Sequence, residues 1–244
     1  MNAMMAIYRR ELRSYFSTSL ATVFIVIFLV MVSAFTFYLG NFFQTGQADL
    51  QAFFLFHPWL YLLLVPALAM RLWAEERKSG SIELLLTLPI TIWQAVVGKF
   101  LAAWTLVGLA LLLTFPMWLT VVWLGDPDNG VILASYMGSY LVAGSFLAIG
   151  SAISATTRSQ VMAFIVTLAV CLLFLLAGYP IVLSAMQAVF NQTAVDAIAG
   201  MSFLTHFTSI TRGILDLRDI AFFVINGIVW LIATVLIINF KKAG

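Results

Sequence analysis

Long runs without any charged side chain are the feature that most constrains this chain. Only 9% of its 244 residues are charged and 63% are hydrophobic, whereas a soluble domain carries roughly 25% charged residues. A helix needs about 20 apolar residues to cross the hydrocarbon core of a bilayer. The chain is therefore expected to be a membrane protein. The uncharged runs of sufficient length cover residues 14–48, 50–70, 100–125, 129–157, 159–195 and 220–240.

We expect one span in each run. The run 159–195 is long enough for two, but Gly178, Tyr179 and Pro180 interrupt it, and the 15 residues after Pro180 are too few for a second crossing. An interfacial or re-entrant extracytoplasmic segment is expected over about 181–215 instead. The sequence thus predicts an all-α polytopic membrane protein with six transmembrane helices in a single domain. The expected spans are about 20–39, 53–72, 98–123, 131–153, 160–179 and 220–240.

The positions of Lys and Arg predict the orientation, because short basic loops resist translocation. With the N-terminus inside, ten basic residues are cytoplasmic and only Arg212 and Arg218 lie outside. Both termini are therefore expected in the cytoplasm. The ten inside residues are Arg9, Arg10, Arg13, Arg71, Arg77, Lys78, Lys99, Arg158, Lys241 and Lys242.

Residues 1–17 have the pattern of an amphipathic helix, with apolar and aromatic side chains on one face and three arginines elsewhere. Such a helix lies in the interface, with its basic side toward anionic headgroups. The alternative is an ordinary basic flank that sets topology. The apolar face comprises Met5, Tyr8, Leu12, Tyr15 and Phe16.

The loop after the second expected span carries a short amphipathic helix over about 81–88. Ser81 is a plausible N-cap, Glu83 complements the positive helix end, and Pro89 closes the helix. An exposed helix this apolar calls for a partner groove; the alternative is that it packs beneath the bundle. Its apolar side comprises Ile82, Leu85 and Leu86.

Two segments resemble the ABC-2-type ABC transporter permeases. The run from Glu75 to Ile90 reads EERKSGSIELLLTLPI, similar to the E-x-x-x-G-(S/T)-(I/L)-E-x-L-L-(S/T)-x-P segment of that family. The run from Phe203 to Ile220 reads FLTHFTSITRGILDLRDI, similar to the segment ending G-(I/V)-(I/L)-D-x-R-D before the last span. Within the family, the chain is most similar to the gliding-motility type permease subunit.

The resemblance implies a permease subunit that moves a substrate, outward, across a bacterial cytoplasmic (inner) membrane with ATP hydrolysed by other chains. It implies two cytoplasmic ABC ATPase subunits, a second permease copy or a homologous permease, and an accessory protein with an extracytoplasmic domain. The helix at about 81–88 would be the coupling helix that docks into the ATPase. The implied ATPase-coupling residues are Glu75, Glu76, Ser81, Ile82, Glu83, Leu85 and Leu86. An alternative within the family is mechanotransmission to an extracytoplasmic or motility partner without transport.

No catalytic or cofactor site is expected on this chain. Lys99 follows Gly98, but Trp93 and Phe100 stand where a phosphate-binding loop needs Gly and Ser or Thr. ATP and Mg are therefore expected on the partner ATPase. His57 and His206 are isolated, so no metal site is expected. The net charge of +2 gives no reason to expect a nucleic-acid partner.

The segment 202–219 is polar for its setting and has two interpretations. One is an outer gate formed by Thr205, Ser209, Arg212 and Asp216, with Arg212 and Asp216 paired on one helix. The other is a capped, solvated helix start before the last span.

The expected spans also argue against two other classes of membrane protein. An ion-coupled secondary transporter or an intramembrane enzyme would need ionisable groups at bundle depth, and no expected span carries a charge near its centre. Gly144, Ala148 and Ala152 recur at four-residue steps in the fourth span, which favours close helix packing within the chain over a dimer seam.

Overall fold

The computed structural model describes residues 3–44, 46–87, 89–188, 190–214 and 216–242, with side chains for all of these except 84–86 and 242. Every regular element in these ranges is a helix, which confirms the all-α prediction. The helices are α1 (Ala3–Ser17), α2 (Leu20–Ala34), the π-helical η1 (Phe35–Leu39), α3 (Gln51–Leu55), α4 (His57–Ala69), α5 (Ala74–Ser79), α6 (Ser81–Thr87), α7 (Ile92–Leu112), α8 (Phe115–Leu124), α9 (Asn129–Thr156), α10 (Gln160–Leu176), α11 (Pro180–Gln187), α12 (Gln192–Ala199), α13 (Phe203–Thr211) and α14 (Leu217–Lys242).

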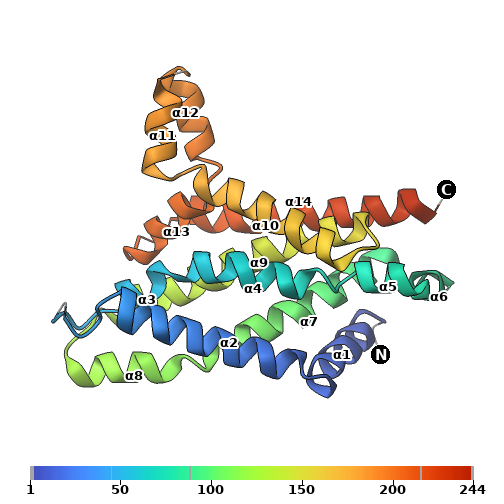
Figure 1. Cartoon of the computed structure of the whole chain (residues 1–244), viewed down its shortest axis with the longest axis horizontal. Helices are drawn as coiled ribbons and strands as arrows, with labels where there is room; N and C mark the ends of the chain where they lie inside the picture. Colours follow the sequence, from blue (N-terminus) through green and yellow to red (C-terminus); the bar gives the residue numbers. More distant parts are fainter. Residues whose placement is uncertain (1–2, 45, 88, 189, 215, 243–244) are drawn as a thin grey trace.

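The long helices form a bundle along the long axis of the molecule (Figure 1). One end of this bundle, here called the terminal end, carries both chain ends together with α1, α5 and α6. The opposite end, here called the far end, carries α3, α8 and α13. The helices α1 and α5 at the terminal end carry Arg9, Arg10, Arg13, Arg77 and Lys78, whereas Arg212 directly follows α13 at the far end.

Helix α9 is the centre of the bundle and packs against α4, α7, α10, α13 and α14. Its small residues allow this. A Cβ atom added to Gly150 would lie 2.4 Å from Cβ of Ala69 on α4, and one added to Gly144 would lie 2.8 Å from Nε1 of Trp104 on α7. Both distances are shorter than any real contact, so the neighbouring helices use the space that glycine leaves. The interpretation of the small residues as intrachain packing is confirmed.

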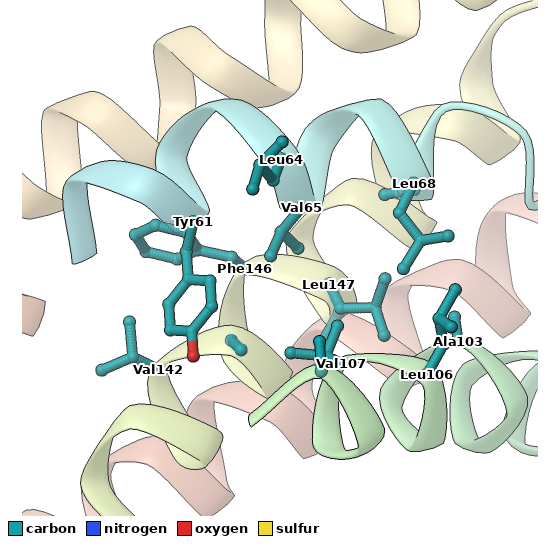
Figure 2. Packing of buried hydrophobic residues seen from close by; sticks show 14 of the residues in the cluster. Tyr61, Leu64, Val65, Leu68, Ala103, Leu106, Val107, Val142, Phe146 and Leu147 are labelled. Carbon is teal, nitrogen blue, oxygen red and sulfur yellow. The ribbon is translucent and has the colours of Figure 1, made fainter. Parts of the chain in front are cut away.

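Figure 2 shows the hydrophobic core where α4, α7 and α9 meet. The one polar atom drawn there, the hydroxyl oxygen of Tyr61, lies 2.8 Å from Oγ of Ser139 and is thereby satisfied. The labelled side chains are Tyr61, Leu64, Val65 and Leu68 from α4, Ala103, Leu106 and Val107 from α7, and Val142, Phe146 and Leu147 from α9.

The prediction of six spans is only partly met. Four described segments are long and apolar enough to cross a membrane, namely Leu20–Leu39, Ile92–Leu124, Asn129–Thr156 and Leu217–Lys241. Helices α10 and α11 qualify only as a pair, and they are bent by 71° at the break before Pro180. The expected span at 53–72 contains α4, which has 13 residues. Six spans are therefore not confirmed by helix length alone.

Local sequence explains why the helix over the second uncharged run is short. Pro58 lies in the first turn of α4, the position that proline favours, so a new helix starts just after α3 ends at Leu55. The other end stops at Ala69, where the chain turns and buries Trp73 completely. An uncharged run measures only the distance between charges and does not detect such breaks.

Helix α7 begins earlier than the expected 98–123 span. Thr91 and Gln94 form a capping box, with the Thr91 N–H donating to the Gln94 side chain at 3.1 Å and the Gln94 N–H donating to Thr91 Oγ1 at 3.3 Å. Lys99 thus lies inside the helix rather than at its edge. The helical path breaks once, between α7 and α8, where Thr114 precedes a first turn that contains Pro116.

Helix α1 packs against α7. A Cβ atom on Gly98 would lie 3.0 Å from the carbonyl oxygen of Met4, so glycine permits the close approach. On α1, Ile7 and Tyr15 are buried, whereas Phe16 is 51% exposed. The expected amphipathic helix over residues 1–17 therefore forms within the described residues, and protein covers much of its apolar face.

The segment 181–215 contains α11, α12 and α13. Helices α11 and α12 pack on each other and project away from the bundle (Figure 1). No described residue of α11 is buried. Helix α13, in contrast, packs against α9 and α14.

Candidate functional site

The candidate site is a sharp bend between α5 and α6, here called the elbow (residues 74–87). Gly80 ends α5 in the left-handed conformation, with φ of 75°, which favours glycine because it has no Cβ. Helix α6 then runs over Ser81–Thr87. Figure 1 shows the elbow at the terminal end of the bundle, where the C-terminal end of α14 also lies.

The residues that the resemblance implies for ATPase coupling lie in different settings along the elbow. Glu75 and Glu83 are exposed, and Ile82 is partly buried against the core. Ser81 is the first residue of α6, and its hydroxyl lies 2.9 Å from that of Ser79, so it does not act as the expected N-cap. Leu85 and Leu86 have no described side chains, and Leu88 lies outside the described residues.

The elbow is attached to the end of α9 by a set of hydrogen bonds. The indole N–H of Trp73 donates to Ser151 Oγ at 3.0 Å. The backbone N–H groups of Trp73 and Ala74 donate to Ser154 Oγ at 3.1 and 3.0 Å, and that hydroxyl donates to the carbonyl of Met70 at 3.1 Å. Because these polar groups are buried, the bonds fix the start of α5 on α9.

A buried charge cluster connects the elbow to α1 and α7. We call it the Lys99 cluster, and it comprises Arg10, Glu11, Glu76 and Lys99. The Lys99 side chain is only 3% exposed, and its ammonium lies 2.8 Å from Oε1 of Glu76 and 3.2 Å from Oε1 of Glu11. Arg10 lies 2.7 Å from Glu11 and 3.7 Å from Glu76. The ammonium also lies 5.3 Å from the ring centroid of Trp73.

The cluster balances two cations against two carboxylates, which makes the burial of Lys99 tolerable. Burial raises the pKa of Glu11, but Lys99 and Arg10 outweigh this effect, so the pKa of Glu11 falls below its ordinary value. Glu11 therefore stays ionised and keeps its bond to Lys99 at neutral pH. Glu76, which the resemblance implies as an ATPase-coupling residue, directs its carboxylate at Lys99 within the chain.

Sequence reasoning did not find this cluster, since it placed Lys99 only at the cytoplasmic start of the expected 98–123 span. A signal was present. Glu11 lies at helical spacing between Tyr8 and Tyr15, on the face of α1 that packs on α7. An acid on that apolar face requires a buried cation, and Lys99 is the one next to Gly98, where α1 approaches most closely.

The four candidate gate residues do not form one helical stripe. Helix α13 ends at Thr211, and Gly213 has φ of 84°, so Arg212 and Asp216 are not one turn apart on a helix. No ion pair joins these two described residues, and the expected intrahelical pair is wrong. Oδ1 of Asp216 instead accepts from the N–H of Arg218 at 2.9 Å, which matches the capped helix start. Thr205 is exposed and Ser209 half-buried.

The far end holds a buried pair that the sequence did not reveal. Nδ1 of His206 lies 2.6 Å from Oδ1 of Asp219, and Nε2 lies 2.9 Å from the carbonyl of Gly200. The imidazole also stacks on Phe222, with centroids 4.0 Å apart. This pair ties α13 to α14. A Cβ atom on Gly138 would lie 2.9 Å from Ile210, so α13 also fits closely on α9.

The described residues contain no group of three or more His, Cys, Asp or Glu side chains that could hold a metal ion. Their chemistry is that of ion pairs, hydrogen bonds and apolar packing between helices. The fold and the elbow therefore define a class: a helical membrane protein with a folded contact segment at one end of its bundle.

The family follows from a comparison with known proteins. Residues 5–239 match the family described as ABC-2 family transporter protein, and the chain belongs to this family. Membership indicates the membrane subunit of an ABC transporter, which is normally not itself an enzyme and associates with ABC ATPase subunits. A search of curated proteins found no match.

Proposed function

We propose that this chain is a permease subunit that moves a substrate outward across a bacterial cytoplasmic membrane, driven by two separate ATPase subunits that bind ATP and Mg. The observation that carries this proposal is the elbow. Its two short helices lie at the terminal end, and its first residues are bonded to α9, α7 and α1. An ATPase that grips α6 could thus move the bundle itself.

We further propose that the terminal end faces the cytoplasm and that the chain crosses the membrane six times. The positive-inside rule supports this orientation, because Arg77, Lys78, Arg158 and Lys241 share one end of the bundle. Helix α9, which covers the expected fourth span, is 28 residues long, enough to span the bilayer. Helix α4 would then cross inside the bundle, and α11 and α12 would form the extracytoplasmic re-entrant segment.

Glu83 gives the sharpest test of docking, because it is exposed on α6. Glu83→Arg should sharply reduce co-purification of the ATPase subunits with the permease, since a reversed charge faces the partner. Asp126→Arg is the matched control, being exposed just after α8. Equal ATPase recovery with both variants, or an active reconstituted transporter that lacks any ATPase chain, would contradict the proposal.

The resemblance to the gliding-motility type supports a second candidate, a subunit that transmits ATPase work to an extracytoplasmic partner without transport. The α11–α12 hairpin favours it, because it projects from the bundle and exposes Ile181 at 70%. In this case a second permease copy and an accessory protein complete the assembly. ATP-driven substrate flux into sealed vesicles separates the candidates: flux supports export, whereas ATP hydrolysis without flux supports mechanotransmission.

A further inference from the structure

A cavity of about 650 Å³ lies beside the elbow at the terminal end of the bundle. Its walls come from α5, α6, the α9–α10 connection and the last turns of α14. Four of its lining residues are basic, and we call it the basic cavity. They are Arg77, Lys78, Arg158 and Lys241.

The positive charge of the basic cavity is not neutralised within the described part of the chain. None of the four basic side chains takes part in an ion pair there, and Glu83 is the only acidic lining residue. Arg77 and Lys241 donate hydrogen bonds to the carbonyls of Ala155 and Thr156 at the end of α9. These bonds hold the two cations in place without removing their charge.

Electrostatic repulsion within the cavity is visible at Arg77. Burial, together with the nearby positive charge of Arg158, lowers the pKa of its guanidinium. Like charges that are held together in this way favour the binding of an anion. Arginine forms paired hydrogen bonds to phosphate oxygens, and lysine contributes a mobile point charge.

The surroundings of the cavity favour a lipid phosphate over an acidic protein side chain. The cavity lies at the ends of α9, α10 and α14, where the long apolar helices stop. Ile238 of α14 and Ile82 of α6 form apolar parts of its lining. Close by in sequence, Phe240 is 77% exposed and Val161 is 66% exposed, so apolar surface continues along α14 and α10. A phospholipid combines a phosphate with an apolar tail in the same way.

We propose that the basic cavity binds the phosphate headgroup of an anionic phospholipid from the leaflet at the terminal end. The lipid would bridge the elbow to the ends of α9 and α14, so its presence would influence how the elbow is held. Basic pockets between transmembrane helices recognise anionic headgroups in this manner. The site borders the proposed ATPase contact, because Ile82 and Glu83 line the cavity, but its four basic residues are not among the implied coupling residues. Lipid binding here does not depend on transport.

The test is lipid retention by the full chain purified in a neutral detergent. Phosphatidylglycerol or phosphatidylcholine is added in equal amounts, and bound lipid is counted by native mass spectrometry. We expect phosphatidylglycerol to be retained preferentially. The double variant Lys78→Gln, Arg158→Gln should lower its retention roughly tenfold, because two attractive charges are lost. These two side chains are chosen because Arg77 and Lys241 also bond to α9.

The matched control is Arg13→Gln, which removes an exposed basic residue of α1 outside the cavity. It should leave retention unchanged. The conservative variant Arg158→Lys should keep most of the binding, and thermal unfolding of every variant verifies that it is folded. Inorganic phosphate at millimolar concentration forms a separate arm, which distinguishes a lipid from a soluble ion.

Four outcomes would overturn the proposal. The first is equal retention of the two lipids by the unmodified chain. The second is an equal loss of lipid retention in Arg13→Gln and in the double variant. The third is full displacement of the lipid by inorganic phosphate, which would indicate a soluble ligand. The fourth is an unchanged lipid count with lost ATPase co-purification in the double variant, which would indicate an acidic protein partner. Failure of the Glu83→Arg experiment, by contrast, would leave these lipid measurements unaffected.

Discussion

Lys99 of α7 and Glu76 of α5 form a 2.8 Å ion pair in which the ammonium is almost entirely shielded from solvent. The pair joins a helix of the bundle to the first half of the elbow. Glu11 adds α1 to the same contact. A displacement of the elbow therefore acts on two further helices, α1 and α7, through one lysine.

Replacing Lys99 should destabilise the protein. Lys99→Met leaves Glu11 and Glu76 without their shared cation, and removing one partner of a buried pair costs about 3 kcal/mol. The expected result is a clear fall in Tm, measured in detergent. Lys78→Met, at an exposed position of α5, should change Tm little. Adding Glu76→Met to Lys99→Met should recover part of the loss; no recovery would contradict the pairing.

Acidification should weaken the Lys99 cluster through Glu11. The pKa of Glu11 in the folded protein lies below the ordinary value of 4.5, so its contribution to stability is complete above 4.5 and is lost as the pH falls through the folded pKa. The Tm advantage of the unmodified protein over Glu11→Gln should therefore shrink below pH 4.5. Glu75→Gln is the control at an exposed carboxylate. A constant Tm difference across this range would disprove the assignment.

Ser154 should be essential for the position of the elbow. Ser154→Ala removes the acceptor of two buried backbone N–H groups, those of Trp73 and Ala74, which costs about 1–3 kcal/mol. We expect a lower Tm and weaker co-purification of the ATPase. The control Ser184→Ala lies on the exposed α11. If Ser154→Ala lowered Tm but left ATPase recovery intact, the bonds would stabilise the fold without positioning the elbow.

The contact between α4 and α9 should not tolerate a methyl group. In Gly150→Ala the new Cβ would meet Ala69 at 2.4 Å, so the two helices must separate, at a cost of about 1–3 kcal/mol. Gly227→Ala on α14 is the matched control, because nothing lies within 4 Å of its Cβ. There, alanine should raise stability by up to about 1 kcal/mol through its higher helix propensity. Equal Tm changes in the two variants would be inconsistent with this packing.

The general fold could be predicted because a bilayer imposes strong constraints on sequence. Uncharged runs gave the helical class and located most of the long helices, and Pro180 marked a real break. Run length could not give the start of α4, because Pro58 begins a new helix inside the uncharged run 50–70 without any charge. The bend between α10 and α11 was anticipated as an end of a span, but its 71° angle was not.

The candidate site was only half predictable. The second helix of the elbow has a local signature, so α6 could be expected from consecutive residues, whereas α5 was not predicted. The Lys99 cluster is different, because it joins residues 11, 76 and 99: the place of Glu11 on an apolar helix face indicates a buried partner, but a single sequence does not pair residues at such separations. His206 and Asp219 illustrate the same limit, since each was recognised as polar but their 2.6 Å contact depends on how α13 meets α14.

The unbroken length of α9 has a mechanical consequence. At 1.5 Å per residue, its 28 residues extend about 42 Å. Ser154 near one tip holds the elbow, and Gly138 toward the other receives Ile210 of α13. A continuous helix that is enclosed by its neighbours tilts as one body. When a displacement at one membrane face tilts α9, its other end therefore moves in the opposite direction at the other face.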